Sequence, residues 1–196
     1  MIDLYTWSTP NGRKVSIMLE ECGLPYAVHK VDITKNEQFT ADFLKLSPNN
    51  KIPAIVDPDG PGAQPYSCFE TGAIPLYLAD KTNKFLPADR AKRFDHIQWL
   101  MWQMGGFGPM LGQTHHFVRF APEQVPYAIK RFTEETQRLY GVLDKRLADN
   151  EWCGGADYGV ALLMITPGAG RQERHRTHLP PVPHAKPWDD AMGPGP

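Results

Sequence analysis

Ser47-Pro48-Asn49-Asn50-Lys51-Ile52-Pro53-Ala54-Ile55-Val56-Asp57 decides the fold, together with Phe69-Glu70-Thr71-Gly72-Ala73-Ile74 further along the chain. The first stretch enters an apolar, β-branched run through the Ile52-Pro53 bond, which predicts a strand over residues 52–56 that begins at a proline. The residue before a proline is held extended, so the N–H and C=O of Ile52 stay available to a ligand. An X-Pro bond can be cis, and we expect a cis peptide at this turn.

The second stretch places an acid and a hydroxyl, Glu70 and Thr71, at the start of a helical pattern that we expect over residues 70–81. The bare N–H groups and the positive end of such a helix attract a carboxylate. Pro75 falls near the end of the first turn, where a missing N–H is tolerated. The two stretches together predict a site for a small peptide, with backbone pairing at Ile52 and carboxylate capture at Glu70 and Thr71. The alternative is that Glu70 and Thr71 only cap the helix.

The rest of the N-terminal half supplies the elements of a thioredoxin-like domain. Alternation with period two predicts a strand over residues 2–7, and turn residues follow at positions 8–12. Apolar residues at helical spacing then predict a helix that ends at Gly23. Further strands are expected over residues 26–31 and 64–68. A short helical or irregular segment is expected over residues 39–46. The order βαβ followed by ββα is that of a thioredoxin-like fold.

Two motifs, residues 49–54 and 69–74, resemble the glutathione-binding half of a cytosolic glutathione transferase. Thr9-Pro10-Asn11-Gly12 is similar to the bacterial Nu class of that family, whose members resemble glutathione-dependent disulfide reductases. The resemblance covers residues 1 to about 158. It implies the glutathione transferase fold, in which an α/β thioredoxin-like N-terminal domain precedes an all-α C-terminal domain. The implied glutathione-binding domain comprises residues 1–80. A linker over residues 81–89 leads to the helical domain, residues 90–196.

Helical patterns replace strand patterns after the linker. Residues 105–109, Gly-Gly-Phe-Gly-Pro, are expected to break or bend the chain between two apolar stripes. The first stripe comprises Phe94, Ile97, Met101 and Met104. The second lies on a long helix over residues 126–147 and comprises Phe132, Thr136, Leu139, Tyr140, Leu143 and Leu147.

The first strand-to-helix turn is the place where a thioredoxin-like fold meets the sulfur of its ligand. Redox members of the fold carry a nucleophilic cysteine there, whereas this chain has Thr9 and Asn11. The resemblance implies that Thr9 and Asn11 are catalytic and activate the thiol of bound glutathione. A hydrogen bond to a charged group contributes about 1.5–3 kcal/mol and a helix N-terminus about 0.3–1 kcal/mol, enough to lower a thiol pKa by about two units. The alternative is that both residues merely cap the helix.

The resemblance also implies contacts to the rest of glutathione. Gln38 is expected at the glycyl or backbone part and Lys51 at the glycine carboxylate. Glu70 fits the α-ammonium, and Thr71 fits the α-carboxylate. Arg131 is expected to reach a glutathione carboxylate, including across a dimer. A solvated surface side chain is the alternative for Gln38, Lys51 and Arg131. The full implied binding set is Asn11, Gln38, Lys51, Ile52, Pro53, Glu70, Thr71 and Arg131.

Two adjacent histidines, His115 and His116, raise the question of a metal site. Adjacent residues point in different directions on a helix, and no acid or further histidine stands four residues from either. We therefore expect no metal here. These histidines are expected to line a second, apolar substrate cleft with Trp102, Met110 and Phe117, and plain core is the alternative.

Composition restricts the function classes. The chain has 196 residues and a net charge of −1, so no electrostatic case exists for nucleic acid or an anionic membrane. No apolar run approaches the roughly 20 residues that span a bilayer. The N-terminus begins directly as a strand, so we expect no signal peptide. Cys22, Cys68 and Cys153 are odd in number and far apart, which favours inert thiols in a reducing cytoplasm.

The resemblance weakens from Gly159 onward. The family places a serine and, three residues on, an aspartate there as a capping box, whereas this chain has Gly159 and Leu162. Either the tail has diverged or lost its order, or the sequence is in error here. We still expect helices over residues 157–166 and 183–192, because glycine is a tolerable N-cap and the run that follows is apolar on all sides. Pro187 should bend the second of these helices.

We therefore expect a homodimeric glutathione transferase that binds glutathione or glutathione disulfide. Its second substrate would be a small disulfide, reduced with glutathione, or an electrophile, conjugated more weakly. The chief alternative is a non-catalytic regulatory or scaffold module, because this fold also serves that purpose. Thr9 and Asn11 favour the enzyme, since a scaffold does not need them. No sequence feature supports a third possibility, a chaperone-like protein.

Overall fold

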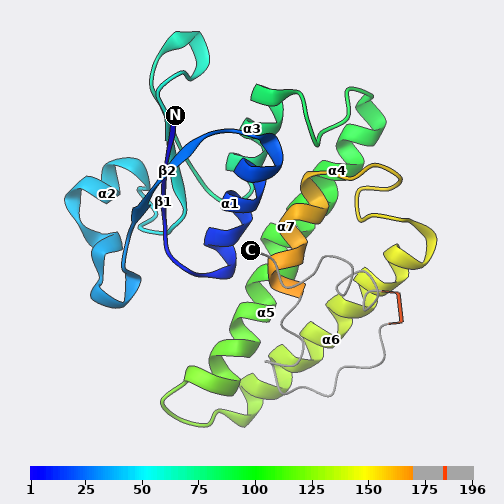
Figure 1. Ribbon diagram of the computed structural model, residues 1–196. Coiled ribbons are helices and arrows are strands. Elements are labelled where there is room, and N and C mark those ends of the chain that lie inside the picture. Colours follow the sequence, from blue (N-terminus) through cyan, green and yellow to red (C-terminus); the bar gives the residue numbers. More distant parts are fainter. Residues whose placement is uncertain (170–182, 185–196) are drawn as a thin grey trace. The chain divides into compact units, whose positions relative to one another are not determined.

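The computed structural model describes residues 1–169 and 183–184 of the chain. The chain divides into two compact units, Met1–Leu86 and Pro87–Pro196 (Figure 1). The first unit is a mixed α/β structure and the second is helical, which confirms the expected fold class. Within the described residues, no helix is both long and apolar enough to cross a membrane.

The first unit is built around one four-stranded sheet. Its elements are β1 (Ile2–Thr6), α1 (Pro10–Cys22), β2 (Tyr26–Lys30), the 3-10 turns η1 (Ile33–Lys35) and η2 (Glu37–Phe39), α2 (Ala41–Leu46), β3 (Ala54–Asp57), the 3-10 turn η3 (Pro61–Ala63), β4 (Tyr66–Phe69) and α3 (Ala73–Thr82). The strand order is β2-β1-β3-β4. β1 pairs in parallel with β2, and the other two pairings are antiparallel. The order of the elements along the chain, βαβ followed by ββα, is the one that the sequence predicts.

Opposite faces of the sheet bury different side chains, because neighbouring strand residues point to opposite sides. Ala54 of β3 packs with Phe43 of α2. Asp57 points to the other face, where Tyr77 of α3 donates a hydrogen bond to its Oδ2 at 2.6 Å and Lys81 Nζ lies 2.9 Å from the same atom. Burial alone would raise the pKa of Asp57, but these partners outweigh it and the pKa is lowered. The cluster ties the end of β3 to α3.

The structure corrects the expected starts of α3 and β3. α3 begins at Ala73 and not at Glu70, because Glu70 has a φ of 78°, outside the helical region. β3 begins at Ala54 and not at Ile52, since the proline that follows Ile52 has no N–H to give to the sheet. Pro75 thereby becomes the third residue of α3, where a backbone N–H would have no partner within the helix.

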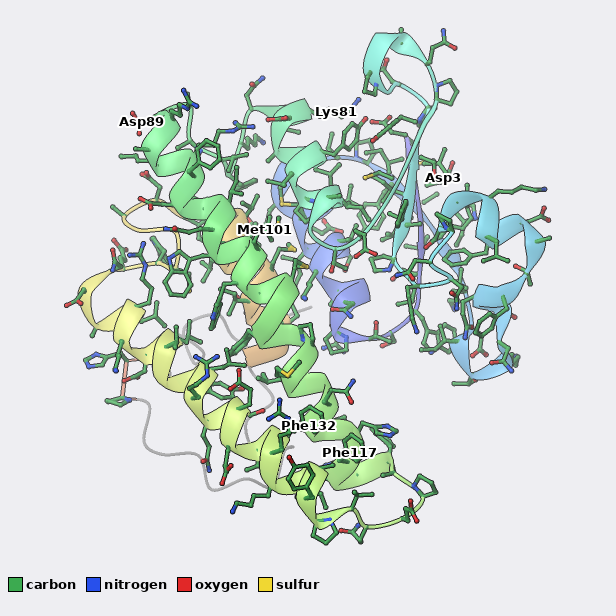
Figure 2. All side chains as sticks on the ribbon, turned by 180° about the vertical axis from the view of Figure 1, so that it is seen from behind. Asp3, Lys81, Asp89, Met101, Phe117 and Phe132 are labelled. Atoms are coloured by element: carbon green, nitrogen blue, oxygen red, sulfur yellow. The ribbon has the colours of Figure 1, made fainter. Side chains whose placement is uncertain are left out.

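The second unit contains four α-helices within the described residues. In chain order its elements are α4 (Arg90–Trp102), the π-helical turn η4 (Gln103–Phe107), α5 (Gly108–His115), the π-helical turn η5 (His116–Phe120), α6 (Pro126–Asp149) and α7 (Val160–Ala169). Figure 2 shows Asp89 at the start of α4, and Phe117 and Phe132 together at the far end of the unit. The rings of Phe117 and Phe132 are stacked, with centroids 5.4 Å apart.

α6 carries the apolar stripe that the sequence predicts. Leu139, Tyr140 and Leu143 are buried and pack with Phe107 of η4 in one core. Thr136 is the buried polar member of the stripe, and its hydroxyl lies 2.7 Å from the hydroxyl of Thr114 in α5. A polar side chain in the stripe is therefore partnered within the core.

The expected stripe on α4 is wrong. Phe94 and Met101 are 56% and 46% exposed, whereas His96 and Leu100 are buried. Of the expected break or bend over residues 105–109, the break is wrong, because the chain stays helical through the π-turn η4 and into α5. A π-turn inserts one extra residue into a helical turn, so it absorbs the irregular sequence without ending the helix.

α7 forms despite its missing capping box. The carbonyl of Gly159 accepts hydrogen bonds from the N–H groups of Leu162 and Leu163 at 3.1 and 3.3 Å. Every residue from Val160 to Ile165 is fully buried. The prediction of a helix here is confirmed, although the helix begins at Val160 and not at position 157. The helix predicted over residues 183–192 lies outside the described residues, apart from a turn at 183–184.

His96 is a buried polar residue of the second unit. It is 1% exposed, and neither ring nitrogen has a hydrogen-bond partner in the described residues. Its ring lies so close to Gly154 that a Cβ there would collide with it. Burial lowers the pKa of His96, and the charge of Arg146 adds to this effect, while Asp157 and Asp95 act in the opposite direction.

We expect the helical unit to lose stability as the pH falls through the ordinary histidine pKa of about 6.5. The unfolded chain then binds a proton that the folded His96 resists, so the free energy of unfolding decreases until the pH reaches the lower pKa of the folded state. His96→Gln should remove this part of the pH dependence. Urea unfolding followed by circular dichroism between about pH 8 and pH 5 measures the effect. An unchanged pH dependence in His96→Gln would contradict the assignment.

Candidate functional site

The N-terminus of α1 carries both residues predicted to act on sulfur. Thr9 is the N-cap, and its Oγ1 accepts a hydrogen bond from the N–H of Gly12 at 3.1 Å. The capping alternative for Thr9 is thus real. It does not exclude the other role, because a hydroxyl that accepts through a lone pair still has its own proton to donate. Asn11 is the second residue of the helix and is exposed.

Gly12 sets how closely this helix end approaches the sheet. A Cβ at position 12 would lie 2.5 Å from Thr6 Oγ1 and would collide with the carbonyl oxygen of Trp7. The first turn of α1 therefore lies directly on the end of β1, a position that only glycine allows without a shift of the backbone.

The loop before β3 has the form that the sequence predicts. The Ile52-Pro53 peptide is cis, as expected. Neither the N–H nor the C=O of Ile52 has a backbone partner among the described residues. Ser47, which is fully buried, donates its hydroxyl to the carbonyl of Lys51 at 2.8 Å. The buried Ser47 hydroxyl thus fixes the loop, while the backbone N–H and C=O of Ile52 remain available to a ligand.

Two polar side chains around this loop can accept or donate further bonds. Gln38 lies in η2, and its Oε1 is buried without a hydrogen-bond partner in the described residues. Buried acceptors nearly always have a partner, so an N–H of a bound peptide suits this atom. Lys51 is exposed, and its ammonium has no ion-pair partner within the described part of the chain. A peptide ligand with amide donors and a carboxylate fits both residues.

Glu70 and Thr71 lie in the turn between β4 and α3. The carbonyl of Glu70 accepts a hydrogen bond from the N–H of Ile74 at 3.0 Å, which fixes the turn to the helix. The carboxylate of Glu70 accepts a hydrogen bond from the side-chain amide of Asn49 at 3.3 Å. The first unit therefore places Glu70 next to the loop that precedes β3, as the paired motifs predict.

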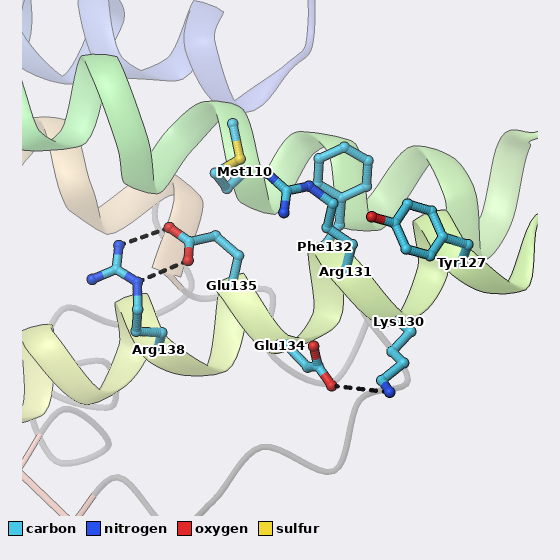
Figure 3. Close-up of a pocket in the computed structure, with 8 residues that line it drawn as sticks. All are labelled: Met110, Tyr127, Lys130, Arg131, Phe132, Glu134, Glu135 and Arg138. Carbon is cyan, nitrogen blue, oxygen red and sulfur yellow. Dashed lines mark hydrogen bonds and ion pairs between the residues drawn. The ribbon is translucent and has the colours of Figure 1, made fainter.

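Arg131 belongs to the second unit, where it lies about a turn and a half into α6 and lines an open cavity of about 620 Å³ (Figure 3). Met110, Phe132 and Tyr127 supply the apolar part of its wall. Arg138 forms a two-fold ion pair with Glu135, at 2.7 and 2.8 Å. No ion pair or hydrogen bond of Arg131 is found among the described residues, although its charge helps to lower the pKa of Glu135. An anionic ligand in this cavity would meet the guanidinium of Arg131.

Comparison with known proteins identifies the family. Residues 9–81 match the family model described as "Glutathione S-transferase, N-terminal domain". Over 193 residues the chain is 50% identical to the disulfide-bond oxidoreductase YfcG of Escherichia coli, and the match covers 98% of this chain and 90% of that protein. The chain belongs to the glutathione transferase family.

Solved structures of glutathione transferases are similar to this chain in sequence and in fold. A glutathione transferase family member from Pseudomonas fluorescens, crystallised with two glutathiones bound, is 50% identical with a TM-score of 0.84, over 87% of this chain and 76% of that chain. A glutathione transferase from Pseudomonas putida, with one glutathione disulfide bound per subunit, is 43% identical with a TM-score of 0.86, over 98% of this chain and 81% of that chain.

The cysteines of this transferase are not candidates for the nucleophile. Cys22, Cys68 and Cys153 are all buried and free. Burial raises the pKa of each thiol, that of Cys153 to about 12. A buried thiol with a raised pKa carries little thiolate at neutral pH and is inert.

The histidine pair of the transferase lies across a helix boundary. His115 ends α5 and His116 begins η5, and the ring of His116 packs edge-on against Phe117. Trp102 stacks on Phe107 at the border of the core, which favours the core alternative for Trp102. Among the described residues, no three His, Cys, Asp or Glu side chains gather where they could hold a metal ion.

Sequence reasoning missed Lys14. It lies in α1, is 3% exposed, and burial lowers its pKa to about 8. Position 14 precedes Met18 and Cys22 by one and two helical turns, so the periodicity places it on the buried face. A lysine on the predicted buried face of this helix is the sequence signal that could have identified it.

We expect Gly12→Ala to destabilise the first unit by about 1–3 kcal/mol, because the new Cβ must displace α1 or the end of β1. Gly112→Ala is a matched control, since a Cβ there meets no atom within 4 Å. That exposed helical change should stabilise the protein by about 0.5–1 kcal/mol. Thermal and urea unfolding measure both effects. Equal effects of the two substitutions would refute the close approach at Gly12.

Proposed function

We propose that this chain is a glutathione-dependent disulfide-bond reductase, with weaker conjugation of glutathione to electrophiles. The observation that carries the proposal is a helix N-terminus with a hydroxyl at Thr9, an exposed Asn11 and no cysteine in the turn. The protein offers no reactive thiol of its own, so the nucleophile must come with the ligand. The 50% identity to the E. coli disulfide-bond oxidoreductase supports the same activity.

Thr9 and Asn11 stabilise the thiolate of bound glutathione in this proposal. Lowering a thiol pKa from about 8.5 by two units requires about 2.7 kcal/mol. The Thr9 hydroxyl proton, or the Asn11 amide, supplies about 1.5–3 kcal/mol as a donor to a charged acceptor. The N-terminus of α1 adds about 0.3–1 kcal/mol. These terms suffice without a general base.

The reaction balances with two glutathiones. The first thiolate attacks one sulfur of the substrate disulfide, forms a mixed disulfide and releases one substrate thiolate, which takes up a proton. A second glutathione thiolate attacks the glutathione sulfur of that mixed disulfide and releases the other substrate thiol. The substrate gains two electrons, and two glutathiones become glutathione disulfide.

The peptide part of glutathione is assigned to the loops around β3. Ile52, next to Pro53, pairs through its backbone, while Gln38 and Lys51 receive the glycyl end. The γ-glutamyl end meets the turn before α3, where Glu70 takes the α-ammonium and Thr71 the α-carboxylate. The unpartnered Gln38 Oε1 and the available Ile52 backbone support this assignment.

We further propose that the protein is a cytoplasmic homodimer. Phe94 and Met101 expose an apolar face of α4 that a second copy would cover. Arg131 contributes a positive charge for a glutathione carboxylate, including that of the partner copy. The three free, buried cysteines suit a reducing compartment.

Thr9→Ala and Asn11→Ala should each lower disulfide-reductase turnover about 10- to 100-fold, the equivalent of one lost hydrogen bond to a charged group. Glutathione affinity should change less than about twofold, because the peptide contacts remain. Assays with 2-hydroxyethyl disulfide and with a chloro-nitrobenzene, together with calorimetry, separate the two quantities.

Thr9→Ser is the control, since it keeps both the cap and the hydroxyl donor. Thr9→Ala also loses a cap of about 1 kcal/mol, which thermal unfolding reports separately. In Thr9→Ala the rise of rate with pH should move to higher pH, because the thiol pKa is no longer lowered. Full turnover in both alanine variants would mean that the backbone alone activates the thiol. Glutathione binding without any turnover in the unmodified protein would favour the scaffold alternative.

Arg131→Gln should raise the KM for glutathione about fivefold and leave kcat unchanged, because the contact is made equally before and during the reaction. Lys130→Gln is the matched control on the same turn, as its ammonium is exposed and lies 3.8 Å from Glu134. Steady-state kinetics at varied glutathione measure both variants. A fall in kcat without a change in KM would contradict a carboxylate contact.

A further inference from the structure

Asn49 is not among the residues assigned to glutathione, yet its side chain contacts one of them. Its side-chain Nδ2 donates to Glu70 Oε1 at 3.3 Å. The two residues are 21 positions apart and lie in different turns, one before β3 and one before α3. Both are exposed on the surface where the peptide ligand is assigned. The bond therefore joins the two loops of the candidate site at the ligand side.

The backbone that carries Asn49 is fixed from within. The buried Ser47 hydroxyl donates to the Lys51 carbonyl at 2.8 Å, and the N–H of Asn50 donates to the Ser47 carbonyl at 2.9 Å. Asn50 adopts a left-handed conformation with φ of 50°, which closes the turn. Asn49 lies inside this closed turn, so its amide starts from a defined position.

Glu70 is fixed at its backbone but not along its side chain. Its φ of 78° and the bond from Ile74 N–H to its carbonyl hold the main chain. A glutamate side chain with three rotatable bonds otherwise loses substantial rotamer freedom when it is ordered. A donor at one carboxylate oxygen selects the rotamer before the ligand arrives, which lowers the cost of binding.

The chemistry of the donor matters as well. An amide orients a carboxylate without cancelling its charge, whereas an ammonium would neutralise it and compete with the ligand. Lys51, two positions away, carries such an ammonium, yet the donor to Glu70 is Asn49. Glu70 Oε2 keeps its lone pairs for a second, cationic donor.

We propose that Asn49 is a positioning residue that orients the Glu70 carboxylate toward the amino group of the γ-glutamyl moiety. This inference rests on the proposed function, since it assumes that Glu70 meets the α-ammonium of glutathione. Asn49 itself touches neither the sulfur nor the peptide backbone of the ligand. Its effect is expected on the affinity for the amino group alone.

The test compares two peptides by calorimetry, glutathione and glutaryl-cysteinylglycine, which is the same tripeptide without the α-amino group. Asn49→Ala should weaken glutathione binding about five- to tenfold, the scale of one exposed, charge-assisted hydrogen bond. Binding of the glutaryl peptide should change less than about twofold. In the reductase assay the KM for glutathione should rise while kcat stays constant.

Two further variants complete the design. Asn49→Ala added to Glu70→Gln should weaken glutathione binding no further, because the charge to be oriented is already absent. Lys45→Ala is the neutral control, because the Lys45 side chain is exposed and pairs only with Asp42 in the described residues.

The outcomes separate the inference from the proposed function. Equal losses for both peptides, or no loss for either, in a protein that still binds and uses glutathione would overturn the role of Asn49 alone. Absence of glutathione binding in the unmodified protein would overturn the proposed function, and the role of Asn49 with it. Thermal unfolding of Asn49→Ala within about 1 °C of the unmodified protein excludes a collapsed turn as the cause.

Discussion

The close approach of α1 to the end of β1 is the constraint on which the candidate site depends. Gly12 has no Cβ, so the first helical turn lies against the carbonyl of Trp7. Thr9 can then cap the helix through Gly12 N–H and still keep a proton to donate. One methyl group at position 12 would move the N–H groups, the hydroxyl and the exposed Asn11 together. The proposed activation of sulfur is therefore a consequence of packing as much as of residue type.

The sequence predicted those features that local chemistry decides. The cis bond at Ile52-Pro53 and the buried stripe of α6 follow from neighbours in the chain, and both are present. The buried face of α4 was not predictable in the same way. Apolar residues lie on two sides of that helix, so periodicity cannot say whether Phe94 and Met101 or His96 and Leu100 point inward. The tertiary packing that decides it, against α7, is not local.

The sequence also did not predict the residues with a positive φ or the polar side chains that are buried. The sequence gives no indication that Glu70 has a φ of 78°. A positive φ is usually indicated by glycine or asparagine, and position 70 is a glutamate. His96 and Lys14 are polar side chains on buried faces, and a pattern of apolar residues treats them as interruptions. The bond from Asn49 to Glu70 joins residues 21 apart, and only the fold brings them together.

The absence of a capping box at Gly159 and Leu162 can be judged by the same comparison of energies. A lost capping box costs about 0.5–2 kcal/mol, whereas burying one large apolar side chain stabilises by about 1.5–3 kcal/mol. Leu162, which stands where the resemblance implies an aspartate, is fully buried and belongs to the core with Tyr140 and Leu143. Burial therefore outweighs the cap, and α7 forms. The residues assigned to the sulfur and the γ-glutamyl group all lie in the unit Met1–Leu86, so this exchange changes what stabilises the helical unit and leaves the composition of the candidate site intact.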